Sequence, residues 1–365
     1  MSTLIAGFIA SFLAGFLLLR YRSVHERFSA DHDTTGIQKF HVRPVPRIGG
    51  IALLVGIVTT IAIHYSANPS IWQFVALLFA CAIPVFAMGL LEDLTKAVSV
   101  RTRFLGAIVS ALLAGYVFDA WLVDVQFIGL NALLAVPAIS ILFTCFAVAG
   151  VTNAFNIIDG YHGLVSIVGC IILAAIAYVA FKVQDFAVMA SALTAIGAVL
   201  GFVIWNYPRG LIFLGDGGAY LLGFWVAELS ILLVTRNIAI SKWFPVLICI
   251  YPIFETVFTM YRRFVLKKAQ VGKPDAIHLH QLIYRRVVRW AVGSDDAVLR
   301  NQRNSLTAPY LWVLASLSVL PAMLFWEHKW VLQAFIVLFA LTYIWLYSRI
   351  MLFRVPKWLL LRDKP

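Results

Sequence analysis

Long apolar segments recur from one end of the chain to the other, and each is close to the length that crosses a lipid bilayer. The pattern predicts an all-α polytopic membrane protein, with residues 1–365 forming one integral membrane domain. The first segment runs into a basic loop and has no basic stretch ahead of it, so we expect a retained anchor rather than a cleaved signal. The eleven predicted segments are residues 3–20, 47–65, 72–90, 103–119, 131–150, 163–182, 186–204, 218–235, 242–260, 309–326 and 330–350.

The composition agrees with this pattern. Hydrophobic residues make up 62% of the chain and charged residues 13%, and the mean hydropathy is +0.90. Such values are typical of an integral membrane protein. Cys81, Cys145, Cys170 and Cys249 all lie inside apolar segments and lack metal-ligand spacing. We expect them to pack as small apolar side chains, without a disulfide framework.

The net charge of +12 would suit a nucleic-acid partner, but the distribution of the basic residues indicates another cause. If the N-terminus lies outside, all 29 Lys and Arg residues fall on the inner side except Lys182, Arg236, Lys242 and Lys329. Cytoplasmic loops of membrane proteins carry such an excess, so the predicted topology is N-out and C-in. The charge then reflects orientation and attraction to anionic membrane lipids, with no nucleic acid as a partner.

A polar stretch at residues 150–163 separates two apolar segments on the predicted inner side. Asn153, Asn156 and Asp159 follow one another at intervals of three, which places their side chains on one face of a helix. Two glycines then end the helix and permit close approach of a ligand. A single Asn would be interpreted as a helix cap, whereas three aligned polar groups at membrane depth indicate a binding site.

Two acidic motifs lie at the ends of other apolar segments on the same side. Glu92 and Asp93 are adjacent at the end of a predicted helix, where they repel each other and oppose the helix dipole. They need a cation nearby, either Lys96 or a divalent ion, although a solvated helix end is the more common explanation. Asp216 stands among three glycines before another segment. It is either a helix cap or a ligand with room for a metal and phosphate oxygens.

Basic and imidazole side chains occupy the remaining inner stretches. Lys39 and Arg47 precede a helix N-terminus, a favourable place for a phosphate, although ordinary positive-inside charges would look the same. His278 and His280 are two residues apart, so they cannot share a helix face but can converge from an extended segment.

Three further expectations concern local structure. The inner loop at residues 261–308 is expected to contain an amphipathic helix at 282–290 that lies on the bilayer surface. Glu255, at membrane depth, is expected to pair with Arg262 two turns later. The mildly alternating residues 119–130 predict a small β-hairpin on the outer side.

The candidate residues all fall on one side of the predicted topology. They describe a polar basin that opens to the cytoplasm and borders the lipid. Carboxylate and amide oxygens suit a hard cation such as Mg²⁺, which keeps waters and takes substrate phosphates as ligands. Lys, Arg and His supply the positive charge that a pyrophosphate would need.

In this order along residues 36–290, the motifs resemble those of the polyprenyl-phosphate N-acetylhexosamine-1-phosphate transferases, the glycosyltransferase 4 family. The resemblance implies transfer of a sugar-1-phosphate from a UDP-N-acetylhexosamine to undecaprenyl phosphate, with release of UMP. It implies Mg²⁺ as cofactor, with Mn²⁺ as a substitute. It also implies a bacterial inner-membrane enzyme whose active site faces the cytoplasm and which starts a cell-envelope polysaccharide, and it is compatible with a homodimer.

The resemblance further implies a role for each matching residue. Asp216 would be the principal metal ligand, and Asn156 would be a second ligand or would act through a water molecule. The implied catalytic residues are Lys39, which would pair with phosphate, and Glu92, Asp93 and Asp159, which would act on the acceptor phosphate or the metal shell. The implied substrate-binding residues are Arg47, Lys96, Asn153, His278 and His280, with the two histidines beside the nucleotide-sugar.

Two positions depart from the family pattern. Glu92 replaces the first aspartate of the usual pair, and His162 stands where many relatives have Asp or Asn. These changes favour an enzyme that initiates lipopolysaccharide or exopolysaccharide synthesis over the phospho-N-acetylmuramoyl-pentapeptide transferase. The sugar stays open among GlcNAc, FucNAc and QuiNAc. The alternative from another functional class is a secondary transporter, whose sites would lie near the membrane midplane.

Overall fold

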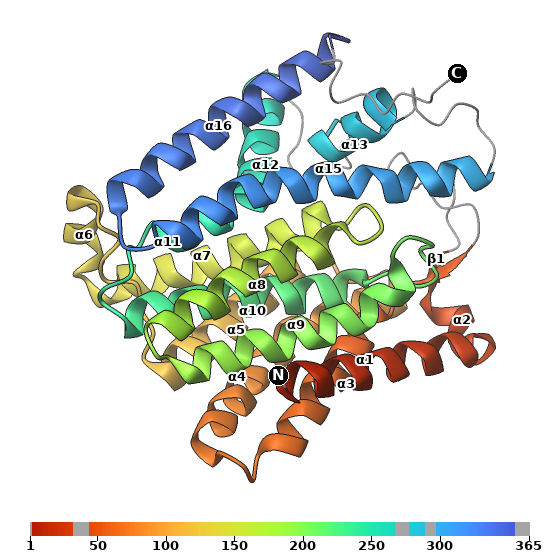
Figure 1. Cartoon of the computed structure of the whole chain (residues 1–365), viewed down its shortest axis with the longest axis horizontal. Helices are drawn as coiled ribbons and strands as arrows, with labels where there is room; N and C mark the ends of the chain where they lie inside the picture. The colour runs from red at the N-terminus through yellow and green to blue at the C-terminus, as the bar shows by residue number, and fades with distance from the viewer. Residues whose placement is uncertain (1, 32–43, 267–276, 289–296, 355–365) are drawn as a thin grey trace.

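The computed structural model describes residues 2–31, 44–266, 277–288 and 297–354. Within these residues the chain forms a bundle of helices, coloured from red at the N-terminus to blue towards the C-terminus in Figure 1. Nine of the described helices are long and apolar enough to cross a membrane. They are α1 (Ser2–Arg20), α4 (Pro69–Thr95), α5 (Val100–Phe118), α7 (Pro137–Ile158), α8 (Leu164–Lys182), α9 (Phe186–Asn206), α10 (Gly215–Arg236), α15 (Ala297–Leu324) and α16 (Lys329–Met351).

The other described elements are shorter. Ala30–Asp31 (β1) pairs antiparallel with Val45–Pro46 (β2) next to the start of α3. The short helices are α2 (Arg22–Ser29), α3 (Gly49–His64), α6 (Ile128–Leu134), α11 (Phe244–Ile248), α12 (Ile250–Tyr261) and α13 (Leu279–Ile283), with π-helical turns η1 (Arg262–Leu266) and η2 (Tyr284–Val288).

The prediction of an all-α polytopic membrane protein is confirmed, and nine predicted segments overlap the nine long helices. The bounds differ most at residues 131–150, where the helix is Pro137–Ile158, and at residues 309–326, where it begins at Ala297. The other two are shorter than predicted. Residues 47–65 contain α3, and residues 242–260 are divided at Cys249 into α11 and α12. Pro252 follows the break and has no N–H to donate to the preceding turn, which favours an interruption there. The four cysteines are buried and unbridged, as expected.

Helix α10 forms the buried centre of the bundle. All its residues from Gly215 to Val234 are buried, and it packs against α3, α4, α7 and α8. A helix that is apolar around its whole circumference is expected at such a central position. The N-terminus of α10 is therefore held by several elements at once, and this is where the polar motifs meet.

The first turn of α10 touches two neighbouring helices backbone to backbone. A Cβ atom on Gly50 of α3 would lie 2.4 Å from the backbone nitrogen of Gly218, and one on Gly89 of α4 would lie 2.7 Å from the Cα of Gly217. Small residues permit such close packing of membrane helices. The approach of α4 brings Asp93, one turn after Gly89, to the start of α10.

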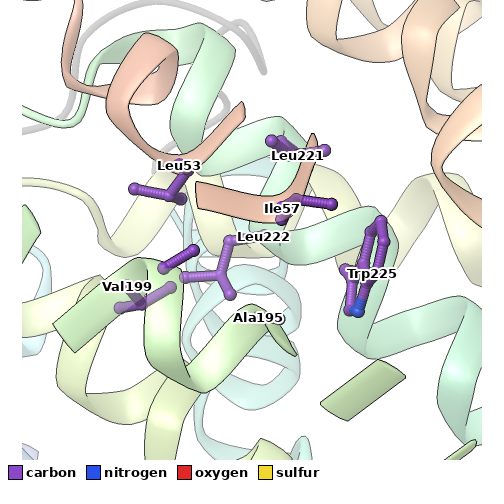
Figure 2. A pocket seen from close by; sticks show the side chains of 8 residues that line it. Leu53, Ile57, Ala195, Val199, Leu221, Leu222 and Trp225 are labelled. Carbon is purple, nitrogen blue, oxygen red and sulfur yellow. The ribbon is translucent and has the colours of Figure 1, made fainter. Parts of the chain in front are cut away.

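A small apolar cavity separates α3, α9 and α10 deeper in the bundle. Figure 2 shows side chains from all three helices around it, among them Leu53, Val199 and Trp225. Of these three side chains only Trp225 has a polar group. Its indole N–H donates a hydrogen bond to the Ser191 carbonyl oxygen (3.0 Å). The cavity therefore has no polar group to orient a substrate and is a gap in the helix packing.

The predicted β-hairpin at residues 119–130 is wrong. These residues form an irregular loop that leads into α6. Asn131 Oδ1 accepts a hydrogen bond from the Val125 amide (2.9 Å), and Asp124 Oδ1 accepts one from the Gln126 amide (2.7 Å). Side chains thus occupy backbone donors that a strand ladder would need.

The predicted interfacial helix is also wrong in the described residues up to 288. Residues 279–288 form α13 and η2, which pack against α15 and α16. Ile283 is 3% exposed and Val287 1% exposed. The apolar face of this segment therefore meets protein instead of lipid. Its later part, including Trp290, lies outside the described residues.

The close contact at Gly89 predicts a loss of stability on adding one methyl group. Gly89→Ala should cost on the order of 1–3 kcal/mol, because the new Cβ would meet the backbone of α10. A thermal unfolding measurement in detergent would check this. Gly150→Ala is the matched control, since a Cβ there meets nothing within 4 Å and Ala favours the helix. Equal melting temperatures for the two variants would contradict the packing argument.

Candidate active site

The site is built around the carboxylate of Asp93. This side chain is 1% exposed and reaches from the last turns of α4 to the start of α10. Its two oxygens accept hydrogen bonds from the backbone amides of Asp216 (2.9 Å) and Gly217 (2.8 Å). Amides in the first turn of a helix have no partner within the helix, and the helix dipole favours negative charge there. Asp93 therefore caps α10 from a different helix.

Asp216, the first acidic residue of α10, is held between two arginines. Its Oδ1 accepts a hydrogen bond from Arg47 Nη2 (2.9 Å), and its Oδ2 forms an ion pair with Arg103 Nη1. Arg47 Nε also lies 3.7 Å from Asp93 Oδ1. Asp216 is 6% exposed, so these charges interact with little screening by water. Two acids and two guanidinium groups thus meet at the start of α10.

Tyr220 connects this cluster to the Asn/Asp motif. It lies one turn after Asp216 in α10, and its hydroxyl group donates a hydrogen bond to Asn153 Oδ1 (3.2 Å). The same hydroxyl group is hydrogen bonded to the Asn156 side chain. The Arg103 guanidinium lies 5.8 Å from the centre of the Tyr220 ring. The prediction that Asn153 and Asn156 share one face of a helix is confirmed, because both meet the same tyrosine.

Asp159 follows the last residue of α7 with a non-helical backbone (φ −77°, ψ 64°), so the prediction that it shares a helix face with Asn153 and Asn156 is wrong. Desolvation raises the pKa of Asp159 to about 7, while the positive charge of Arg47 acts in the opposite direction. The charges of Asp159 and Asp93 also interact. The charge of Asp159 is therefore coupled to those of Asp93 and Arg47.

The histidine pair approaches this cluster from the C-terminal half of the chain. His278 precedes α13 and His280 lies within it, and their rings stack with centres 5.1 Å apart. His280 packs edge to face against Tyr161, with ring centres 5.5 Å apart. A Cβ on Gly160 would lie 3.5 Å from His280 Nε2. The two histidines converge as predicted, but at the start of helix α13 and not from an extended segment, and they meet the end of the Asn/Asp motif.

Glu255 holds the histidine pair in place, which corrects its predicted pairing with Arg262. Its Oε1 lies 3.0 Å from His278 Nδ1 and accepts a hydrogen bond from the Leu279 amide (3.1 Å). Its Oε2 accepts a hydrogen bond from the Tyr343 hydroxyl group (2.7 Å). After the inner loop the chain returns to Glu255, and it is His278, not the arginine two turns later, that pairs with this carboxylate.

Two of the predicted site residues serve the turn between α4 and α5. Glu92 Oε2 accepts a hydrogen bond from the Val98 amide (2.7 Å). Lys96 ends α4 in the left-handed conformation (φ 57°), and its Nζ donates to the backbone oxygen of Asp93 (2.7 Å). The cation nearest the Asp93 carboxylate in the described ion pairs is Arg47 instead of the expected Lys96. Lys39 lies outside the described residues.

Two residues of the cluster, Arg103 and Tyr220, carried no predicted role. Arg103 belongs to a short basic run after Glu92 and Asp93, which looks like ordinary positive-inside charge. Tyr220 lies four residues after Asp216, and this helical spacing is the one sequence signal that could have identified it.

The donor set fits a hard divalent cation in its chemistry. Asp216 and Asn156 offer oxygen ligands, which Mg²⁺ prefers. In the described residues no three His, Cys, Asp or Glu side chains lie close enough together to hold a metal by themselves. A site of this kind takes its remaining ligands from water and from substrate phosphates. The arrangement thus suits a cation that binds together with a phosphorylated substrate.

The chain is similar to known membrane transferases over the region that carries the cluster. Residues 74–234 match the profile of glycosyl transferase family 4. A probable undecaprenyl-phosphate N-acetylglucosaminyl 1-phosphate transferase of Bacillus subtilis is 29% identical over 252 residues, which are 68% of this chain and 68% of the relative. The undecaprenyl-phosphate α-N-acetylglucosaminyl 1-phosphate transferase of Thermotoga maritima is 28% identical over 278 residues, 76% of this chain and 81% of the relative.

A second kind of relative matches at a similar level. The phospho-N-acetylmuramoyl-pentapeptide-transferase of Streptococcus mutans is 29% identical over 276 residues, which are 71% of this chain and 79% of the relative. The matched family region contains Asp93, Asn156, Asp159 and Asp216, the residues that the structure gathers at the start of α10. The chain is a multi-pass membrane protein whose residues 74–234 match glycosyl transferase family 4.

Proposed function

We propose that this protein transfers an N-acetylhexosamine 1-phosphate from its UDP derivative to undecaprenyl phosphate, releasing UMP. The observation that carries the proposal is Asp216, held at the N-terminus of α10 between Arg47 and Arg103, within the family 4 region. Carboxylates and guanidinium groups at a helix N-terminus suit a diphosphate and its counter-ion. UDP-GlcNAc is the first donor to test, because relatives are named for N-acetylglucosaminyl 1-phosphate transfer.

In the proposed reaction a phosphate oxygen of the lipid attacks the β-phosphorus of the UDP-sugar. A new P–O bond forms there, and the bond from the β-phosphorus to the bridging oxygen breaks, so UMP leaves with that oxygen. Phosphoryl transfer needs in-line positioning and neutralisation of charge more than covalent chemistry. Arg47 and Arg103 can pair with phosphate oxygens through two parallel N–H donors each.

Asp216 and Asn156 are the proposed protein ligands of Mg²⁺. When bound, the ion would supply positive charge to the diphosphate oxygens. Asp93 has a structural role in the same site, because both its oxygens accept hydrogen bonds from the α10 backbone. The second pKa of a phosphate monoester is near 6, so the acceptor is ionised at neutral pH without a strong base. We therefore assign Asp93 to positioning Asp216 rather than to proton removal.

The site is proposed to face the cytoplasm of a bacterial inner membrane. The excess of Lys and Arg on this side of the topology supports that orientation. The transporter alternative would place substrate groups near the midplane. Asp93, Asp159 and Asp216 instead lie at the ends of α4, α7 and α10, which favours an enzyme that works at the membrane surface. The relatives named as undecaprenyl-phosphate N-acetylglucosaminyl 1-phosphate transferases match over 68% and 76% of this chain, which supports an initiating transferase of polysaccharide synthesis.

The activity can be tested with purified protein, undecaprenyl phosphate and MgCl₂ by measuring UMP release. The donors would be UDP-GlcNAc and the UDP derivatives of FucNAc and QuiNAc. We expect UMP with at least one of them and none after chelation of the metal by EDTA. Absence of UMP with every donor, from protein that is folded and monodisperse, would refute the proposed function.

The role of Asp216 predicts that Asp216→Asn lowers kcat by at least about 100-fold, because the amide is a weaker ligand and carries no charge. The matched control is Asp185→Asn. Asp185 caps α9 and pairs with Arg236 (2.8 Å) outside the cluster, so its variant should keep near-normal turnover. Comparable activity of the two variants would refute the assignment of Asp216.

The capping role of Asp93 predicts a graded series. Asp93→Asn keeps one acceptor for the α10 amides, whereas Asp93→Ala keeps none. We expect melting temperature and kcat to fall together from wild type to Asn to Ala, with a cost of about 0.5–2 kcal/mol or more for loss of the cap. If Asp93 were an essential base, both variants would be equally inactive at unchanged stability, and the capping role would be wrong.

A further inference from the structure

The α7–α8 loop, which begins with Asp159, is hydrogen bonded to a helix outside the matched family region. The His162 backbone amide donates a hydrogen bond to Asn304 Oδ1 (2.8 Å), and the Gly163 carbonyl oxygen accepts one from Trp312 Nε1 (3.2 Å). Both partners belong to α15, and Asn304 is 4% exposed. Residues 142 and 149 positions later in the chain thus hold the backbone of two successive residues of this loop.

His162 and Gly163 also contact the loop that leads to Asp216. Asn206, at the end of α9, accepts a hydrogen bond from the Gly163 amide (2.6 Å) and donates one to the Ile212 carbonyl oxygen (2.8 Å). His162 Nδ1 lies 3.2 Å from the Pro208 carbonyl oxygen. A Cβ on Gly210 would meet the His162 ring. The loops that precede α8 and α10 therefore contact each other directly through side chains and backbone.

The His162 side chain is 4% exposed. It is enclosed by the Pro208–Gly210 backbone and by Phe213, whose ring centre lies 5.7 Å from its own. In this arrangement the imidazole faces the neighbouring loop and is covered from a ligand. The presence of His162 in place of Asp or Asn therefore affects how the loop is held. It would influence the choice of donor only by changing the position of Asp159.

A second set of contacts reaches the loop from α15. The Arg303 guanidinium lies 5.5 Å from the centre of the Tyr284 ring, which lies 5.5 Å from that of Tyr161. Tyr161 in turn packs against His280. Helix α15 thus supports the loop both by hydrogen bonds and through packed rings that include the histidine pair.

We propose that the start of α15 is part of the active site and that Asn304 is a positioning residue for Asp159. The inference rests on the proposed transferase function. Asp159 lies three positions before His162, so anchoring the His162 backbone keeps Asp159 within about 10 Å of that anchor, and α7 fixes the chain on the other side of Asp159. Asp159 interacts with Arg47 and Asp93, so a displaced loop would alter the charges that face the phosphates. A misplacement of about 1 Å in an active site can cost about 100-fold in rate.

The test combines hydrogen–deuterium exchange with kinetics on the full chain. Asn304→Leu removes the acceptor at similar size, whereas Asn304→Asp retains an oxygen at the same position. In Asn304→Leu we expect exchange in a peptide covering residues 159–164 to be roughly tenfold faster, as for loss of one buried hydrogen bond. We expect kcat for UMP release to fall by about 10- to 100-fold, with KM for the UDP-sugar within about threefold. Asn304→Asp should recover most of both properties.

The matched control is Thr307→Val on the same helix. Thr307 is fully buried, and its hydroxyl group donates to the Arg303 carbonyl oxygen (2.8 Å) within α15. The variant therefore loses a hydrogen bond of α15 that does not reach the loop, and it should leave both exchange at 159–164 and kcat unchanged.

Three results would overturn the inference. They are unchanged exchange at residues 159–164 in Asn304→Leu, unchanged kcat despite faster exchange, and equal losses of kcat in Asn304→Leu and Thr307→Val. Absence of UMP release by the wild-type protein would refute the proposed function instead. The exchange measurement would then still decide whether Asn304 holds the loop.

Discussion

A buried carboxylate on one helix caps the first turn of another, and the geometry of the whole site depends on that contact. Asp93 binds two amides of α10, and it can do so because glycines let α4 and α10 approach backbone to backbone. Capping and close packing support each other, since the carboxylate reaches the amides only at this separation. Buried backbone amides need a partner, so the acid also satisfies donors that the apolar surroundings could not.

The capped end of α10 then determines where the charges gather. Asp216 is presented by the first turn of α10, and Arg47 reaches both Asp216 and Asp93 from the residue that follows β2. Arg103 completes the cluster from the beginning of α5. Buried charges persist when they are paired and hydrogen bonded. In the proposed reaction these groups would exchange their partners for phosphate oxygens and a cation, which relates the stability of the site to its proposed chemistry.

The C-terminal part of the chain completes the site around this centre. Glu255, which accepts a hydrogen bond from Tyr343, holds His278, and α15 holds the loop after Asp159. These contacts come from helices beyond the region that matches the family profile, which ends at residue 234. The family region supplies the acidic groups, while the later helices restrict the loops between them. Both parts are needed because loops at a membrane surface have little apolar packing of their own.

The sequence alone determined the class of the protein and the identity of most of the cluster. Long apolar segments identify membrane helices because each helix satisfies its backbone hydrogen bonds internally. The spacing of Asn153, Asn156 and Asp159 predicted one helix face, because helical periodicity is a local property. The joint presence of these residues with Asp93 and Asp216 led to the resemblance to glycosyltransferase family 4, and the model of that family matches residues 74–234.

Only the tertiary structure decided which polar group meets which. Asp93 and the amide of Asp216 are 123 residues apart, and Arg47 and Asp216 are 169 apart. Residue types permit many such pairs, and packing of apolar helices selects among them. Glu255 was expected to bind a neighbour in its own helix, but the folded chain brings His278 closer. Residues 282–288 were expected to lie against lipid, yet helices α15 and α16 cover them. An amphipathic pattern shows that one face of a helix is apolar, but it does not show whether lipid or protein covers that face.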